Sequence, residues 1–230
     1  ARIRFADELS QLHAVEPDLR AAVLSDGAGT LLDQARWARS ASALGLMSAH
    51  KPSLLNAGNS FEASWALRYQ DVKLIEAPGA IAVQEWFERT EWVSLPGDQL
   101  AYAPHLCSST LPGVPIKPVL FQMEWADRTA PNPAGTNLIR AANLRESTSV
   151  YRHDLARAIA PNLPADPHMI FYNVPATDQA RAIRTAGQKQ IAEFLADDGA
   201  RILDINDIVR PMFGKDLFEI PAWLPEVMNY

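Results

Sequence analysis

The sequence predicts an α/β fold, with a parallel β-sheet in its second part and a helical region before it. From Lys117 onward, short apolar runs alternate with segments of helical periodicity, which is typical of parallel strands connected by helices. Residues 1–67 are rich in Ala and Leu and contain few strand signals. A stretch punctuated by proline and glycine, residues 96–115, separates the two parts. We therefore expect residues 1–100 to form a helical lid or cap region and residues 101–230 to contain the sheet.

In the first part, three segments have the composition of helices. They are Phe5–Val15, Pro17–Leu24 and Leu31–Leu46, and the glycine-containing break Asp26–Gly29 precedes the third. Pro17 suits the first turn of its helix, because a backbone N–H at that position has no partner within the helix. A fourth helical pattern covers Gly79–Val93, where large apolar side chains are interleaved with charges.

The second part begins with Val119–Met123, a short apolar run of the kind that forms a buried parallel strand. Asn132 and Pro133 then predict a helix that ends at Ala142, with the Asn132 side chain as its cap and Pro133 in its first turn. The next strand is expected over Thr148–Tyr151, where β-branched and aromatic residues occur close together.

A long helix is predicted over Asp178–Ala196. Thr177 can cap its first turn, Gly199 can end it, and its apolar residues fall on one face. The tail from Arg210 onward carries three prolines among aromatic residues, so we expect it to be an irregular segment laid over the body of the protein.

Composition and charge exclude several classes of function. With 48% apolar and 21% charged residues, the chain has the composition of an ordinary globular protein. Its net charge of −6 and its scattered basic residues argue against a nucleic-acid-binding surface. No apolar window approaches the roughly 20 residues that cross a bilayer. The single cysteine, Cys107, cannot form an intrachain disulfide and gives no metal-site spacing.

Asp127 and His168 are the candidate catalytic residues. Asp127 follows the predicted strand Val119–Met123, and ligands of open α/β sheets bind at the carboxyl ends of strands. His168 ends the turn-forming tripeptide Asp166-Pro167-His168, which follows the next predicted strand. A carboxylate that binds one imidazole nitrogen leaves the other free to take a proton from a nucleophile. The two residues are therefore predicted to be the acid and the base of a hydrolytic triad.

Other interpretations of these residues stay open. Asp127 could be a turn residue that accepts backbone N–H groups. His153 also follows a predicted strand and ranks second for the role of the base, because its neighbour Asp154 places it more simply in a capped turn. His153, Asp154, Asp166 and His168 could also be combined into a metal site, but their spacing matches no metal-binding motif.

The nucleophile of such a triad is missing from the sequence. A serine hydrolase of α/β type carries Gly-x-Ser-x-Gly at a strand-to-helix turn, and these 230 residues contain no such pentapeptide. Ser60 is the nearest match and is interpreted as a helix cap. Cys107 lies near His105, but no orienting group accompanies them, so a structural cysteine is the better interpretation. The chain begins with Ala1, and we expect the nucleophile on an upstream segment that was removed or lies on another chain.

Several longer passages resemble one known group of enzymes. They are GAIAVQEWFERT (Gly79–Thr90), YAPHL (Tyr102–Leu106), KPVLFQMEWADRTAPNP (Lys117–Pro133), YRHD (Tyr151–Asp154) and DPH (Asp166–His168). Together they are similar to the C-terminal half of large bacterial α/β-hydrolase lipases, of the virulence factor lipase type. The resemblance covers most of the chain, from the lid region to the tail.

The resemblance implies an α/β-hydrolase sheet, of which this chain holds the C-terminal part. In that family, the carboxylate after the strand and the histidine of the later loop are the acid and base of the triad, which correspond here to Asp127 and His168. The resemblance implies a serine-dependent esterase and suggests an extracellular or cell-envelope location, and we expect no cofactor and no metal. Glu124 and Trp125 depart from the pattern, because such hydrolases often have a glycine near the acid.

The sequence thus leads to two hypotheses. The first is hydrolysis of carboxylic esters, lipid-like or polyester, in which a serine on an N-terminal fragment attacks the carbonyl. His168 then moves the proton, and Asp127 holds the imidazole. The chain would be one product of a cleavage, paired with that fragment. The alternative is a catalytically inactive hydrolase-like domain that acts as a binding module, which the missing serine motif suggests.

Overall fold

The computed structural model describes residues 13–30, 32–34 and 80–226, which form a mixed α/β fold around one sheet. The described sheet has four strands in the order β1-β2-β3-β4. Strands β1, β2 and β3 are parallel, and β4 runs antiparallel to β3. Their bounds are Ala22–Ser25 for β1, Val119–Glu124 for β2, Thr148–Tyr151 for β3 and Phe218–Glu219 for β4. The prediction of an α/β fold with a largely parallel sheet is confirmed.

Helices connect and cover the strands. In chain order they are α5 (Ala80–Ser94), α6 (Gln99–Tyr102), α7 (Pro104–Cys107), α8 (Asn132–Ala142), α9 (His153–Ile159), α10 (Asp178–Ala196) and α11 (Asn206–Phe213). Two short 3₁₀ helices, η4 (Leu95–Gly97) and η5 (Arg145–Ser147), lie between them. None of the helices in the described ranges is long and apolar enough to cross a membrane.

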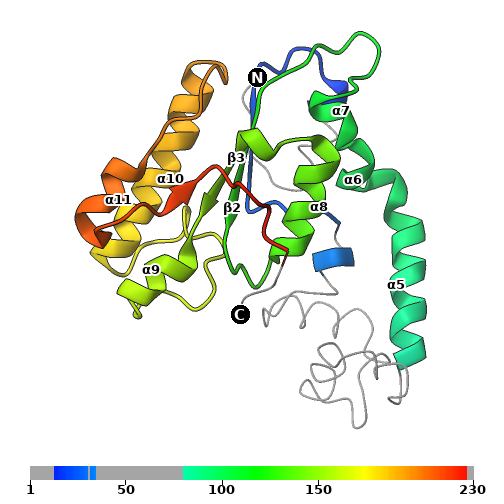
Figure 1. Ribbon diagram of the computed structural model, residues 1–230. Coiled ribbons are helices and arrows are strands. Elements are labelled where there is room, and N and C mark those ends of the chain that lie inside the picture. The colour runs from blue at the N-terminus through cyan, green and yellow to red at the C-terminus, as the bar shows by residue number, and fades with distance from the viewer. Residues whose placement is uncertain (1–12, 31, 35–79, 227–230) are drawn as a thin grey trace.

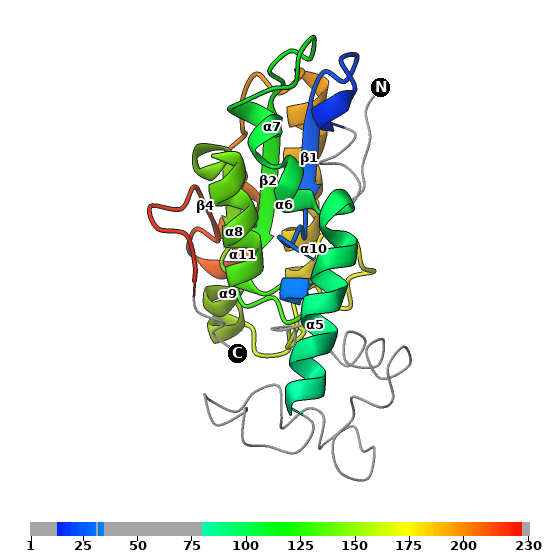
Figure 2. The same ribbon diagram turned by 90° about the vertical axis from the view of Figure 1, so that its right-hand side faces the viewer.

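Helices α8 and α10 lie on opposite faces of the sheet, which gives the protein three layers (Figure 1 and Figure 2). On one face, Leu138 and Ile139 of α8 pack with Phe121 of β2. On the other, Phe194 of α10 packs with Leu120. Successive residues of a strand point to opposite faces, so β2 contributes to both cores and is buried along its whole length.

A third apolar cluster lies where β3 and β4 meet α9 and α11. The ring centroid of Tyr151 lies 5.4 Å from that of Phe218 and 5.8 Å from that of Phe171. All three rings are buried. Phe171 comes three residues after His168, so this packing fixes the end of the loop that carries the histidine.

The parallel register places the carboxyl ends of β1, β2 and β3 on one edge of the sheet. Ser25 lies opposite Gln122, and Gln122 lies opposite Ser149. The loops that follow the three strands therefore meet along a common edge, which we call the rim. In open α/β sheets this edge is the usual place for a ligand.

The predicted helix Pro17–Leu24 is wrong, because its second half is strand β1. Ala22 donates its backbone N–H to the carbonyl of Pro118 at 3.0 Å, and β1 then pairs with β2. Pairing with a fully buried neighbour outweighs the helix propensity of Ala and Leu. β1 thus belongs to the sheet, although it lies within the first hundred residues.

Much of the predicted lid region lies outside the described residues. This holds for most of Phe5–Val15, for nearly all of Leu31–Leu46 and for Ser60. Within the described part, the helical pattern of Gly79–Val93 corresponds to α5, so that prediction is confirmed. The division of the chain near residue 100 stays a prediction.

The elements predicted for the second part agree closely with the structure. The strand over Thr148–Tyr151 and the helix over Asp178–Ala196 have the predicted bounds, and Thr177 Oγ1 accepts the backbone N–H of Ala180 as a cap. Asn132 is not the side-chain cap of α8. Instead, α8 begins at Asn132, and the side-chain oxygen of Asn132 accepts the backbone N–H of Ala126 at 3.1 Å.

The tail is more regular than predicted. It contains the end of α11 and strand β4, which pairs with β3. The buried Asn206 binds this segment through its side chain: Oδ1 accepts the backbone N–H groups of Leu217 and Phe218 at 2.9 Å, and Nδ2 donates to the carbonyl of Phe218 at 2.8 Å. Such long-range hydrogen bonds leave no periodic signal in the local sequence.

Candidate active site

The structure brings Asp127 and His168 together at the rim. Asp127 follows β2, His168 lies in the loop between α9 and α10, and His168 Nδ1 is 3.0 Å from Asp127 Oδ2. Asp127 is 1% exposed, whereas the His168 side chain keeps 27% of its surface accessible. A buried carboxylate thus binds one nitrogen of a partly accessible imidazole. This is the arrangement that the sequence predicts for the two residues.

A tight turn holds the Asp127 carboxylate in this orientation. Its Oδ1 accepts the backbone N–H groups of Thr129 at 2.7 Å and Ala130 at 2.8 Å, which leaves Oδ2 for the imidazole. Ala126 adopts a left-handed conformation with φ of 67°, and its backbone N–H donates to the Asn132 side chain. Thr129 and Ala130 in the loop before α8, together with Asn132 at the start of that helix, therefore hold Asp127 in place.

Asp166 joins the Asp127 turn to the His168 loop. Its Oδ1 accepts the backbone N–H groups of Arg128 at 3.0 Å and His168 at 3.1 Å. Its Oδ2 accepts the hydroxyl of Thr129 at 3.1 Å. One carboxylate thus connects the two candidate residues, a role of Asp166 that was not predicted from the sequence.

Electrostatics at the site favour a charged imidazole. Burial opposes the charge, but the hydrogen bond to Asp127 and the negative charges of Asp127, Asp26 and Asp166 outweigh it, and they raise the pKa of His168 from 6.5 to about 9. Burial also raises the pKa of Asp127, while its hydrogen bond to His168 acts against that rise. At neutral pH the resting ring is therefore an imidazolium that must lose a proton before it can act as a base.

The second nitrogen of His168, Nε2, is the open side of this pair. Within the described residues it makes no hydrogen bond, and the His168 side chain is part-exposed. A hydroxyl placed there would transfer its proton to an imidazole whose Nδ1 side is already bound. The geometry thus pairs a buried carboxylate with an imidazole and leaves Nε2 without a partner among the described residues.

His153, the second-ranked histidine, lies in the core. Its Nδ1 is 3.2 Å from the Tyr151 hydroxyl and its Nε2 is 2.8 Å from the Pro164 carbonyl, so both nitrogens are used. Burial is the main reason why the pKa of His153 falls to about 4, which makes it a neutral ring at physiological pH. With Nε2–H as the donor and Nδ1 as the acceptor, its hydrogen bonds are satisfied. His153 is a structural residue.

The metal combination considered from the sequence is not assembled in the described part of the structure. His153 is fully hydrogen-bonded, and Asp154 forms a two-pronged ion pair with Arg152. A different group does come together: ligand atoms of Asp26, Asp127 and His168 lie within 4.8 Å of one another. Within this group, Asp127 and His168 already bind each other through Oδ2 and Nδ1.

Cys107 is not placed as a nucleophile. Its sulfur lies 3.9 Å from the backbone carbonyl of Lys117, and burial raises the pKa of the thiol. A thiol that is harder to ionise is less reactive, so the structural interpretation of Cys107 agrees with these contacts. His105, the neighbour considered with it, has its Nδ1 2.5 Å from the Ser109 carbonyl.

Two acidic residues of the rim were not predicted from the sequence. Asp26 follows β1, and Glu124 is the last residue of β2. Burial, the charge and contact of Asp26 and the charge of Asp127 raise the pKa of Glu124 well above its ordinary value of 4.5. A signal for Asp26 does exist: the apolar run Ala21–Leu24 ends in Ser25-Asp26-Gly27, which is how a buried strand passes into a rim loop.

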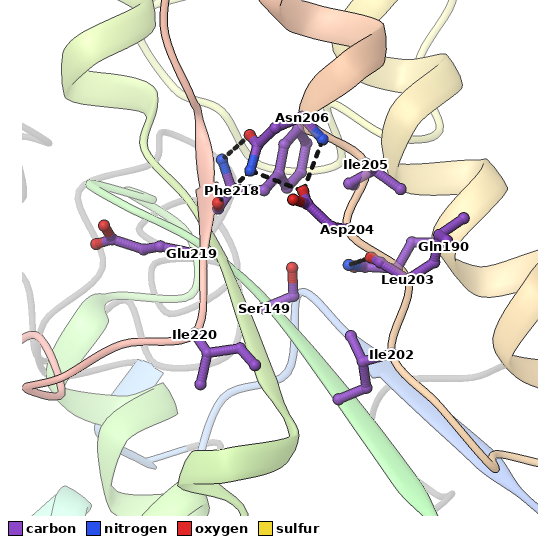
Figure 3. A pocket seen from close by; sticks show the side chains of 10 residues that line it. All are labelled: Ser149, Gln190, Ile202, Leu203, Asp204, Ile205, Asn206, Phe218, Glu219 and Ile220. Carbon is purple, nitrogen blue, oxygen red and sulfur yellow. Dashed lines mark hydrogen bonds between the residues drawn. The ribbon is translucent and has the colours of Figure 1, made fainter.

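A pocket of about 310 Å³ lies away from this site, between β3, β4 and the segment that leads to α11 (Figure 3). None of the candidate residues lines it. Its polar groups serve the fold: Asn206 binds Asp204 and the β4 backbone, and Gln190 donates to the Leu203 carbonyl. We therefore place the candidate site at the rim and not in this pocket.

Comparisons with protein-family models, with curated proteins and with solved structures found no match for this chain. The likeness to bacterial α/β-hydrolase lipases rests on the sequence passages alone, and it stays a prediction.

Proposed function

We propose that this chain is the C-terminal part of an α/β-hydrolase that cleaves carboxylic esters by acyl transfer. The observation that carries the proposal is the 3.0 Å contact between His168 Nδ1 and Asp127 Oδ2 at the rim of a parallel sheet. A serine outside these residues attacks the ester carbonyl, His168 Nε2 takes its proton, and Asp127 stabilises the imidazolium. The same proton then passes to the leaving alcohol.

The position of β1 supports a nucleophile on a further segment. β1 is an edge strand of the described sheet, and its carboxyl end lies on the same rim as His168. A parallel strand added beside β1 would also end on this rim, which would bring a residue at its tip close to Nε2. An N-terminal fragment bound in this way is the partner that we propose.

Exposed apolar side chains favour a lipid-like or polyester substrate. Met169 and Val174 belong to the loop of His168, and Val174 is 90% exposed. On α5, which we propose to be part of the lid, Trp92 and Val93 are also exposed. Exposed apolar side chains in the loop that carries the proposed base suit a substrate with an apolar acyl chain.

The test uses the native protein as isolated, treated with a fluorophosphonate probe that labels activated serines. We expect the adduct to map to a serine outside this sequence. In the full-length protein, His168→Ala should reduce hydrolysis of a chromogenic short-chain ester by on the order of 10⁴-fold or more. The control is His105→Ala, which removes a ring whose Nδ1 binds the nearby Ser109 carbonyl, and it should leave turnover within about twofold. Equal losses in the two variants would contradict the assignment of the base.

A second candidate is a hydrolase-like binding module. It is favoured by the absence, within the described residues, of any hydroxyl bound to His168 Nε2. In that case the native protein is folded, but the fluorophosphonate labels none of its serines and it cleaves no ester. Labelling of any serine that depends on His168 excludes this candidate.

A further inference from the structure

Asp26 is a second carboxylate beside the imidazole of His168. Its oxygen, an oxygen of Asp127 and a ring nitrogen of His168 lie within 4.8 Å of one another. Asp26 is 8% exposed, so water screens its charge weakly. The charged groups that face the ring are Asp127 from the end of β2, Asp26 from the end of β1 and Asp166 from the same loop. The negative charges of three separate segments thus act on one imidazole, and only Asp127 is hydrogen-bonded to the ring.

The backbone around Asp26 holds it against the His168 loop. Asp26 adopts a left-handed conformation with φ of 57°, which aspartate tolerates better than most residues. Its backbone N–H donates to the Gln122 carbonyl at 3.3 Å, and its Oδ1 accepts the backbone N–H of Met169 at 3.4 Å. Met169 directly follows His168, so Asp26 connects β1 to the loop that carries the imidazole.

Glu124 contacts Asp26 from the other side. It is 1% exposed, and its Oε1 has no hydrogen-bond partner among the described residues. Two buried carboxyl groups in contact cannot both be charged without a large cost, so one of them binds a proton. Because burial and the charges of Asp26 and Asp127 raise the pKa of Glu124 well above its ordinary value, Glu124 is the one that is protonated. Its O–H can then donate to the side chain of Asp26.

We propose that Asp26 is a positioning residue for His168: its carboxylate holds the loop of the imidazole and, as a second negative charge, stabilises the protonated ring. The proposal deepens and rests on the proposed function, in which His168 is the base. Asp127 already binds His168 directly, so the group does not require a divalent cation to hold its members together.

The proposal makes a specific statement about pH dependence. With its pKa raised to about 9, His168 is mostly protonated at pH 7, so ester hydrolysis should increase as the pH rises through about 9. Asp26→Asn removes one negative charge, while the amide oxygen can still accept the Met169 N–H. The rising limb of the pH–rate profile should then move to lower pH, and activity at pH 7 should increase several-fold. A purely structural role would instead lower the rate at every pH and leave the limb in place.

The direct test is an NMR titration of the His168 ring in the chain, which does not depend on ester turnover. Asp26→Asn should lower the titration midpoint by about one unit, as expected for loss of a charge at this separation. Asp26→Glu should restore most of the shift. The matched control is Asp154→Asn, which removes a carboxylate paired with Arg152 and should leave the His168 midpoint where it is in the parent protein.

The outcomes separate this proposal from the proposed function. A shifted midpoint in a protein that hydrolyses no ester supports the role of Asp26 and contradicts ester hydrolysis. An unchanged midpoint in folded Asp26→Asn overturns the role of Asp26, whatever the activity. Asp26→Ser is the second variant, because its hydroxyl can also accept the Met169 N–H without a charge. If neither variant folds, Asp26 serves the fold and not the imidazole, which also overturns the proposal.

Discussion

Two side chains on the rim, the part-exposed His168 and the buried Glu124, have pKa values shifted so that each favours the protonated form at neutral pH. His168 is charged because carboxylates surround it, and Glu124 is neutral because burial and the neighbouring acids Asp26 and Asp127 disfavour its charge. Both shifts come from the same cluster of acids. Residues with such perturbed pKa values gather at functional sites, which is why the rim is the candidate site on physical grounds as well as by position.

Glu124→Gln should stabilise the protein at pH 7 by about 1–3 kcal/mol. In the folded state Glu124 is protonated, whereas in the unfolded state it ionises above its ordinary pKa of 4.5, so folding must take up a proton. This cost grows as the pH rises above 4.5, and glutamine, a neutral side chain of the same shape, avoids it. Urea unfolding at pH 7 and pH 4.5 measures the difference, which should nearly vanish at the lower pH.

The control for this variant is Glu88→Gln on the exposed surface of α5, which should change stability by less than about 0.5 kcal/mol. A loss of stability at pH 7 in Glu124→Gln would show that the Glu124 carboxyl is charged in the folded protein. That result would contradict the protonation of Glu124 and, with it, the hydrogen bond that we infer from Glu124 to Asp26.

At the scale of elements, α10 packs closely against the loop that carries His168, through a contact between Gly187 and the ring of Phe171. A Cβ atom added at Gly187 would lie 2.5 Å from Cδ1 of Phe171, so the helix can approach this closely only with glycine there. The Phe171 ring is buried and stacks on Phe218 at 6.0 Å, which leaves it little room to move. Gln188 of the same helix donates to the Phe171 carbonyl at 2.9 Å.

Gly187→Ala should therefore destabilise the protein by about 1–3 kcal/mol through overpacking, despite the higher helix propensity of alanine. Gly135→Ala is the matched control inside α8. Its added Cβ would lie 3.3 Å from Cε of Met123, the flexible end of a side chain that can shift. We expect this control to be neutral or slightly stabilising. Denaturant unfolding of both variants measures the contrast, and equal stabilities would contradict the close approach of α10 to Phe171.

At the scale of the whole molecule, the sequence was informative where a signal is local. The apolar run of β2, the cap at Thr177 and the break at Gly199 are properties of neighbouring residues, and α10 has the predicted bounds. The meeting of Asp127 and His168 followed from one general rule, that parallel strands end on a common edge. β1 was missed because its conformation depends on pairing with β2, almost a hundred residues away. Asp26 was missed for the same reason, because a residue can be assigned to the rim only once the strand that precedes it has been predicted.

The contacts that join these distant segments predict how stability depends on pH. The pKa of His168 is raised in the folded state from 6.5 to about 9, so its stabilising contribution is fully present below pH 6.5 and is lost as the pH rises through about 9. The free energy of unfolding of the parent protein minus that of His168→Gln should therefore fall by roughly 3 kcal/mol between pH 6 and pH 10. Guanidinium unfolding of both proteins at pH 6, 8 and 10 measures this change.

His153→Gln gives the opposite pattern and is the control. Because the pKa of His153 is lowered to about 4 in the folded state, this ring destabilises the protein only as the pH falls below 6.5. Its loss should cost a constant amount of stability from pH 7 to pH 10, from the hydrogen bonds to Tyr151 and Pro164. If the two variants showed the same pH profile, the carboxylates of the rim would not be holding a proton on His168, and the geometry on which the proposed base depends would not persist in solution.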